Sequence, residues 1–183
     1  MQAFASIMNT IWSVLAIVAQ IASLLIVIAI FTKKTPKPLA RALSLISNKA
    51  LMLSFAVSLL AVIGSLIYSD VIGYEPCKLC WFQRIFMYPL VVLFGIALWN
   101  KDEGIKRYGL VLSAIGGCIA LFHYVGQLGF NPFGLKCLAI GYSSSCAKNF
   151  VLEFGYITIP MMAFSAFLLI FVSLWLSHRN STQ

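Results

Sequence analysis

The chain has 183 residues, of which 61% are hydrophobic and only 10% are charged, and its mean hydropathy is +0.96. Soluble globular domains are about half apolar and a quarter charged, so this composition excludes a water-soluble globule and indicates an integral membrane protein. The net charge of +8 could suggest a nucleic-acid-binding protein, but the lysines and arginines gather in short connections between apolar blocks. We therefore expect the lipid bilayer, and no nucleic acid, as a partner.

Five apolar blocks follow one another along the chain. About 20 residues of helix cross a hydrocarbon core of roughly 30 Å, and each block is close to that length. The apolar runs are continuous rather than alternating, which favours helices over the strands of a membrane barrel. The sequence predicts an all-α membrane protein with spans over residues 11–31, 50–68, 81–99, 108–128 and 157–177.

The first block is predicted to be a retained helix rather than a cleaved signal peptide. Residues 1–10 carry no lysine or arginine, and the apolar run is longer than the usual core of a signal peptide. Lys33 and Lys34 follow it like a stop-transfer signal.

Basic residues predict the orientation of the bundle, because short loops rich in lysine and arginine stay in the cytoplasm. They cluster between blocks 1 and 2 and between blocks 3 and 4, which places these connections and the C-terminal tail inside and the N-terminus outside. The connections 69–80 and 129–156 then face outward, and each holds a pair of cysteines. Disulfides persist on that side of a membrane and are rare in the cytosol.

Cys77 and Cys80 form a Cys-x-x-Cys at the start of the third span. Pro76 suits a helix start, and the unpaired N–H groups and positive dipole end of a helix stabilise thiolate over thiol. Residues three and four apart share a helix face, so Cys80, Gln83 and Arg84 are expected to point the same way. An arginine inside a span costs about 2.5 to 3.5 kcal/mol at the helix centre and is a candidate functional residue, although it could also extend to the lipid headgroups.

Cys137 and Cys146 form a second pair, enclosing residues 138–145. This connection contains Gly141 and three consecutive serines, a composition suited to presenting a disulfide to another protein. Redox activity and a structural clip both remain open for either pair. A zinc site built from the four thiols is disfavoured because no histidine flanks either pair and oxidising conditions compete for the thiolates, so we expect no metal.

The fourth span contains three further candidates. Cys118 follows Gly116 and Gly117 in mid-span, and we expect a buried thiol with a packing role. His123 and Gln127 lie four residues apart on one helix face, where an interhelical hydrogen bond and a ligand role are both possible.

The string Pro76-Cys77-Lys78-Leu79-Cys80-Trp81-Phe82-Gln83-Arg84 resembles the DsbB family of bacterial membrane disulfide oxidoreductases, especially the short-loop members called BdbC. The match extends through residues 85–89, 122–124 and Gln127 to Cys137 and Cys146, and covers about residue 49 to the C-terminus. Family members usually have four spans with both termini in the cytoplasm. The resemblance therefore implies an antiparallel four-helix redox bundle over 49–183, with 1–48 adding one N-terminal transmembrane helix and a basic cytoplasmic connection.

The resemblance also implies a relay in the bacterial inner (plasma) membrane. A soluble thioredoxin-fold thiol oxidase of the DsbA type would react with the Cys137/Cys146 disulfide, forming its mixed disulfide with Cys137, and Cys146 would exchange with Cys77. The electrons would pass from Cys80 to a quinone of the membrane pool, ubiquinone or menaquinone, and the residues expected to bind it are Arg84, Gln83, His123 and Gln127.

Two alternatives differ in class. A naphthoquinone reductase resembling vitamin K epoxide reductase also combines loop cysteines with a Cys-x-x-Cys, but there the loop pair comes first in the chain, whereas here it follows. A non-enzymatic membrane scaffold would use its disulfides only to stabilise loops.

The loop between Cys137 and Cys146 is shorter than in many Gram-negative DsbB proteins. This departure from the family bears on how far the second cysteine pair can travel towards the first.

Overall fold

A computed structural model of the chain describes residues 2–31, 37–129 and 150–181. The elements in these ranges are α1 (Gln2–Phe31), α2 (Lys37–Asn48), α3 (Ala50–Leu66), the π-helical turn η1 (Ile67–Val71), α4 (Lys78–Asn100), α5 (Ile105–Gln127) and α7 (Ile159–Ser181). Five of the described helices are long and apolar enough to cross a membrane. The predicted all-α membrane fold is confirmed, with most helix ends a few residues from the predicted bounds.

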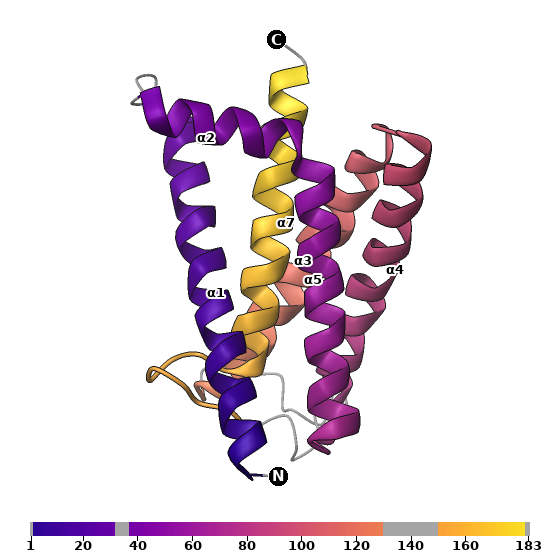
Figure 1. The fold of residues 1–183 in the computed structure, drawn as a ribbon. Helices are drawn as coiled ribbons and strands as arrows, with labels where there is room; N and C mark the ends of the chain where they lie inside the picture. The colour runs from indigo at the N-terminus through magenta and orange to yellow at the C-terminus, as the bar shows by residue number, and fades with distance from the viewer. Residues whose placement is uncertain (1, 32–36, 130–149, 182–183) are drawn as a thin grey trace.

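α7 occupies the centre of the bundle and packs against α1, α3 and α5, while α4 packs against α3 and α5 (Figure 1). The two termini lie at opposite ends of the bundle, as five crossings require (Figure 1). The largest apolar cluster joins α3, α4, α5 and α7 through buried side chains that include Leu90, Phe94, Phe167, Ile170 and Leu174. α1 lies at the edge of the bundle, on α7.

The basic connection between the first two spans contains a helix, α2, that was not predicted from the sequence. α2 lies across the end of the bundle, roughly perpendicular to the spans (Figure 1). Leu43 and Ile46 pack against the cluster between α1 and α7, while Arg41 and Ser44 are exposed. A helix with one apolar and one polar face is suited to the membrane–water interface.

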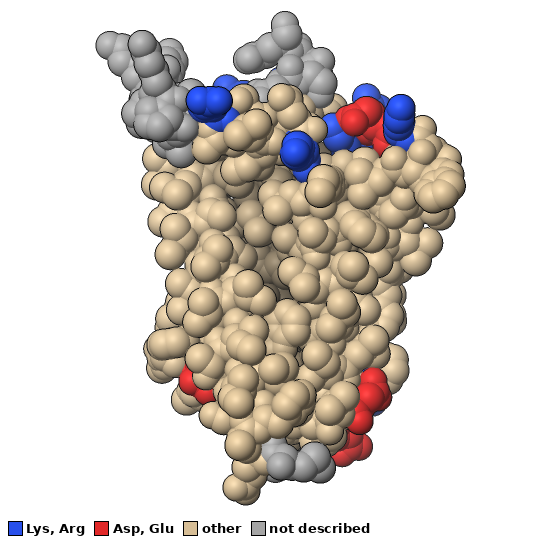
Figure 2. Space-filling view, viewed as in Figure 1, with Lys and Arg blue, Asp and Glu red and all other residues tan. Residues whose placement is uncertain are grey.

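Charged side chains divide between the two ends of the bundle. Most lysines and arginines visible in Figure 2 gather at the end formed by α2 and the C-terminus, and acidic side chains are visible at the other end. The broad surface between the two ends carries almost no charge in this view, as expected of a surface that faces lipid (Figure 2).

The packing prediction for Cys118 is wrong in one respect. Cys118 is exposed on the outer surface of α5, whereas Gly116 and Gly117 are buried. Successive residues of a helix are about 100° apart, so a thiol next to two buried glycines can point out of the bundle. The glycines make the close helix approach: a Cβ on Gly116 would lie 2.4 Å from the Phe167 ring of α7.

Candidate active site

The segment that connects α3 to the first cysteine pair begins with a π-helical turn and is held by stacked aromatic rings. The last turn of α3 widens into η1, and such π-helical turns frequently occur at functional sites. Tyr68 of η1 stacks on Tyr74 at 5.8 Å between ring centroids, and Tyr74 stacks on Phe150 at 5.0 Å. The stack fixes the segment that leads into Cys77.

Cys77 is the N-cap of α4, with φ −74° and ψ 170°, and its carbonyl accepts the first hydrogen bond of the helix from Trp81 N at 3.1 Å. Cys80 lies in the first turn. The two Sγ atoms are 3.4 Å apart, and Cys77 is only 4% exposed. Both sulfurs therefore lie at the positive end of α4, where the unpaired N–H groups stabilise a thiolate. The expected start of the helix at the cysteine pair is confirmed.

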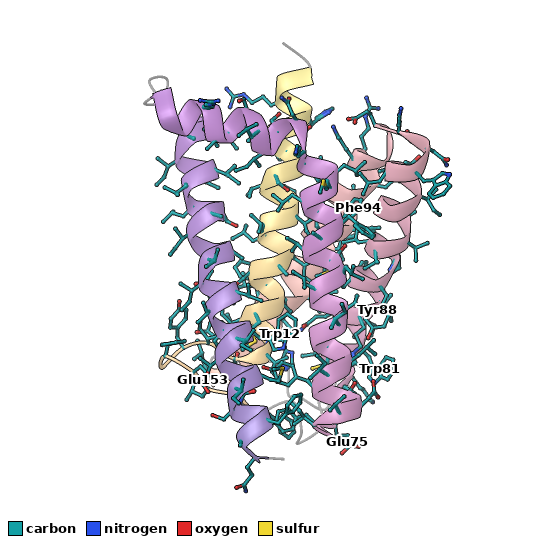
Figure 3. The ribbon with its side chains drawn as sticks, in the orientation of Figure 1. Trp12, Glu75, Trp81, Tyr88, Phe94 and Glu153 are labelled. Carbon is teal, nitrogen blue, oxygen red and sulfur yellow. The ribbon has the colours of Figure 1, made fainter. Side chains whose placement is uncertain are left out.

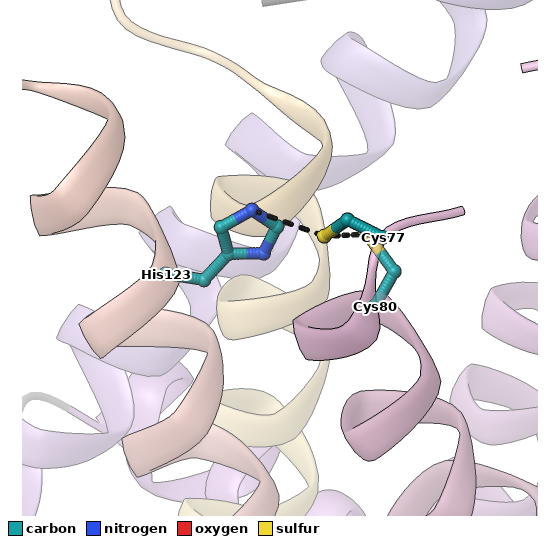
Figure 4. Close-up of side chains that lie close together, drawn as sticks. All are labelled: Cys77, Cys80 and His123. Carbon is teal, nitrogen blue, oxygen red and sulfur yellow. Dashed lines mark hydrogen bonds between the residues drawn. The ribbon is translucent and has the colours of Figure 1, made fainter. Parts of the chain in front are cut away.

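His123 of α5 contacts the first cysteine from the neighbouring helix. Its Nε2 is 3.7 Å from Cys77 Sγ (Figure 4). Its Nδ1 is 3.1 Å from Gln83 Nε2. When the Gln83 amide donates to Nδ1, a neutral imidazole carries its proton on Nε2 and donates it to the sulfur. The buried chain Gln83–His123–Cys77 can thus stabilise a Cys77 thiolate or exchange a proton with the thiol.

Cys77, Cys80 and His123 are also a cluster whose ligand atoms lie within 4.8 Å of one another, close enough to hold a metal ion. The sequence argument against a metal rested on the lack of histidine near either pair in the chain. That argument missed His123, which α5 supplies. The absence of a metal stays a prediction.

Arg84 is held by the end of α3. Its Nε donates to Ser65 Oγ at 2.9 Å, one Nη donates to the Ser65 carbonyl at 3.0 Å, and the guanidinium lies 5.1 Å from the Trp81 ring centroid. The ion pairs found among the described residues include none to Arg84. The cation is thus fixed in place and partly buried without an anionic partner in the described part of the chain.

A cavity of about 480 Å³ joins these groups. Its walls are mostly apolar side chains of α1, α3 and α7, and its polar end contains both cysteines and all four predicted binding residues: Cys77, Cys80, Gln83, Arg84, His123 and Gln127. Three buried polar atoms on its walls have no hydrogen-bond partner among the described residues, namely Trp12 Nε1, Tyr88 Oη and Gln127 Oε1. Trp12 comes from α1 and Tyr88 from α4, and both are labelled in Figure 3.

The sequence analysis missed Ser65, Tyr68 and Trp12 as site residues. Their chemistry gives no signal in a hydrophobic run, because serine and aromatic residues are common in transmembrane helices. The second predicted pair, Cys137 and Cys146, lies outside the described residues.

The fold and the site define a multi-pass helical membrane protein with a dithiol at a helix start, the arrangement of a membrane disulfide oxidoreductase. A family model described as "Disulfide bond formation protein DsbB" matches residues 47–177. The chain belongs to the DsbB family.

The relatives cover most of the chain. "Probable disulfide formation protein C 1" of Bacillus anthracis is 40% identical over 133 residues, 72% of this chain and 93% of the relative. "Disulfide bond formation protein C" of Bacillus subtilis (strain 168) is 41% identical over 130 residues, 71% of this chain and 93% of the relative. A "Probable disulfide formation protein" of Oceanobacillus iheyensis is 43% identical over 128 residues, 69% of this chain and 86% of the relative. No solved structure matches the chain.

Proposed function

We propose that this chain reoxidises a soluble thioredoxin-fold, DsbA-like thiol oxidase and passes the electrons to a membrane quinone, ubiquinone or menaquinone. The observation that carries the proposal is that one cavity contains both the Cys77/Cys80 dithiol and the Arg84 guanidinium. A redox-active dithiol and a fixed cation next to the same apolar space suit the reduction of an uncharged, lipid-soluble acceptor.

The relay has three balanced steps. The dithiol of the partner reduces the Cys137–Cys146 disulfide and becomes a disulfide, with Cys137 forming the mixed disulfide. The loop dithiol then reduces a Cys77–Cys80 disulfide through attack of Cys146 on Cys77. Finally the Cys77/Cys80 dithiol becomes a disulfide again, and its two electrons and two protons are accepted by the quinone.

The second step needs the loop pair to reach Cys77, and the aromatic stack supports this. Cys146 precedes Phe150 by four residues, so the covalent chain limits their Cα separation to roughly 14 Å. Phe150 is stacked on Tyr74, which is three residues before Cys77. Cys146 is thus only four residues along the chain from a side chain that packs beside the segment leading into Cys77.

His123 supports the same step from the other side. Attack of Cys146 on Cys77 releases the Cys80 thiolate, and attack of Cys137 on Cys146 then releases Cys77. The departing Cys77 thiolate can accept the His123 N–H and lies at the N-terminus of α4, and both stabilise it. Gln83 fixes the imidazole orientation through Nδ1.

The cavity fits a quinone. Its apolar walls match an isoprenoid-substituted ring, and Arg84 can donate to a carbonyl oxygen that gains negative charge on reduction. The Gln127 amide oxygen has no partner in the described part of the chain and is free to accept a hydrogen bond from a ligand in the cavity, and the amide can also turn to donate through its nitrogen. Arg84, Gln83, His123 and Gln127 are the residues we assign to quinone binding.

We further propose that the chain lies in the bacterial plasma membrane with both cysteine pairs on the extracytoplasmic side, and that residues 49–183 form the redox bundle. The gathering of basic side chains at the α2 end supports this orientation, because that end is opposite the N-terminus of α4 (Figures 1 and 2).

The test is a reconstituted assay. The protein is purified in lipid, mixed with a reduced DsbA-like protein and a quinone, and quinone reduction is followed by absorbance. Quinone reduction that depends on the thiol partner is expected. A protein that leaves the quinone oxidised, and whose cysteines stay disulfide-bonded in thiol trapping whatever the state of the quinone pool, would instead be a scaffold with structural disulfides.

A further inference from the structure

One wall of the cavity is formed by residues that precede the part of the chain matched by the family model. The match begins at residue 47, whereas α1 ends at Phe31. Seven α1 side chains nevertheless line the cavity: Trp12, Leu15, Ala16, Val18, Ala19, Ala22 and Ile26. The extra helix is therefore positioned at the proposed quinone site, and does more than add a membrane anchor.

α1 is held firmly against α7. Ala19 and Ile26 are buried in a cluster with Leu169, Val172 and Leu176. Gln20 Nε2 donates to Ser165 Oγ at 2.9 Å, and Tyr156 Oη donates to Gln20 Oε1 at 2.9 Å. The first of these bonds joins α1 to α7, and the second joins α1 to the segment before α7. Interhelical hydrogen bonds stabilise helix association in membranes, so α1 is a fixed part of the bundle.

Trp12 brings α1 into contact with α3 at the wall of the cavity. Its indole ring lies against Gly64, where a Cβ would be 3.1 Å from the ring. The next residue, Ser65, is the one that holds Arg84. Trp12 and Arg84 thus meet consecutive residues of α3 and line the same cavity.

The indole N–H of Trp12 is buried and has no acceptor among the described residues. A buried donor without a partner costs about 1–3 kcal/mol, and such groups in native structures usually have a reason. A quinone carries two carbonyl oxygens on opposite sides of its ring and no N–H or O–H group. It can therefore accept from Arg84 and from a second donor at once.

The mouth of the cavity suits a ligand from the bilayer. α1 and α3 make few contacts with each other, and the face shown in Figure 2 is hollowed between them. Leu15 of α1 and Leu60 of α3 line the cavity and are also exposed on the apolar surface. A lipid-dissolved molecule can enter here without crossing water.

We propose that α1 is part of the quinone site and that Trp12 is a binding residue, with its indole N–H donating to a quinone oxygen and its ring covering the head group. This inference rests on the proposed quinone reduction and deepens it.

The test compares Trp12→Phe with Trp99→Phe in the full-length protein in lipid. Phenylalanine keeps an aromatic wall and removes the N–H. Trp99 is the control, because it is 88% exposed and does not line the cavity. The first readout is KM and kcat for a short-chain benzoquinone and a naphthoquinone. The second is quenching of tryptophan fluorescence by the same quinones with no thiol partner present.

Trp12→Phe is expected to raise the quinone KM by roughly three- to tenfold with little change in kcat, as the loss of one hydrogen bond predicts. It should also remove much of the quenching, and Trp99→Phe should leave KM unchanged. An unchanged KM in Trp12→Phe, or a fall in kcat alone, would overturn the role of Trp12. A wild-type protein that reduces no quinone contradicts the proposed function instead, and the quenching titration then still decides whether Trp12 meets the quinone.

Discussion

Tyr74 stacks on Phe150, with ring centroids 5.0 Å apart, and this contact links the segment before Cys77 to the segment that follows the second cysteine pair. An aromatic pair of this kind contributes about 0.5–1.5 kcal/mol beyond its buried area. The contact should therefore favour exchange between the two dithiols.

Removal of the stack should slow that exchange. Phe150→Ala is expected to reduce the rate at which Cys77/Cys80 reoxidises the loop thiols by up to about tenfold, as the loss of one aromatic contact predicts. Rapid-quench thiol trapping after mixing with a reduced partner measures this step. Phe150→Tyr keeps the ring and should behave like the wild type. Equal rates in Phe150→Ala and the wild type would show that the stack does not guide the loop.

Cys77 and Cys80 should be essential for activity, whereas Cys118 should not. Cys77→Ser and Cys80→Ser are each expected to abolish quinone-dependent oxidation of the partner, because neither variant can form the disulfide that the relay needs. Cys118→Ala is the matched control, since its thiol is exposed on the outside of α5, away from the cavity. Turnover assays and membrane fractionation check activity and insertion. Normal turnover in either serine variant would refute the assignment.

Arg84 should act through both its charge and its geometry. Arg84→Leu is expected to lower kcat/KM for the quinone by about 10- to 100-fold, the range for losing a hydrogen bond from a charged group. Arg84→Lys keeps the charge but cannot donate through a fixed fork to both the Ser65 hydroxyl and carbonyl, so a partial loss is expected. Full activity of Arg84→Leu, measured by quinone absorbance, would exclude the cation from the site.

Gln83 should act through His123. Gln83→Leu leaves Nδ1 of a buried imidazole without its partner, so Cys77 should react more slowly with an alkylating reagent. The double variant with His123→Leu should be no slower than His123→Leu alone, because the two residues form one chain to the sulfur. Additive losses in the double variant would contradict this coupling. Thermal unfolding of each variant separates reactivity from stability.

Hydropathy was enough to predict the five spans and the all-α fold, because the length and continuity of an apolar run depend on the thickness of the bilayer. It was not enough to predict the rotation of each helix, since both lipid and the bundle interior accept apolar side chains. Cys118 shows this limit: its neighbours suggested burial, but it faces outward. The face shared by Cys80, Gln83 and Arg84 was predictable from helical spacing within α4. Their partners Ser65 and His123 belong to the packed helices α3 and α5, and helical spacing within α4 gives no information about them.

Adjacent glycines of α5 provide a final test of the packing. A Cβ at Gly116 would lie 2.4 Å from two atoms of the Phe167 ring, whereas a Cβ at Gly117 would meet the Phe167 Cβ at 3.5 Å, an ordinary contact. Phe167 is fully buried in the core, so its ring has no room to move aside. Gly116→Ala is therefore expected to destabilise the protein by about 1–3 kcal/mol, and Gly117→Ala to have little effect. Unfolding of the two purified variants in detergent measures the difference. Equal stability would mean that α5 and α7 lie further apart than described.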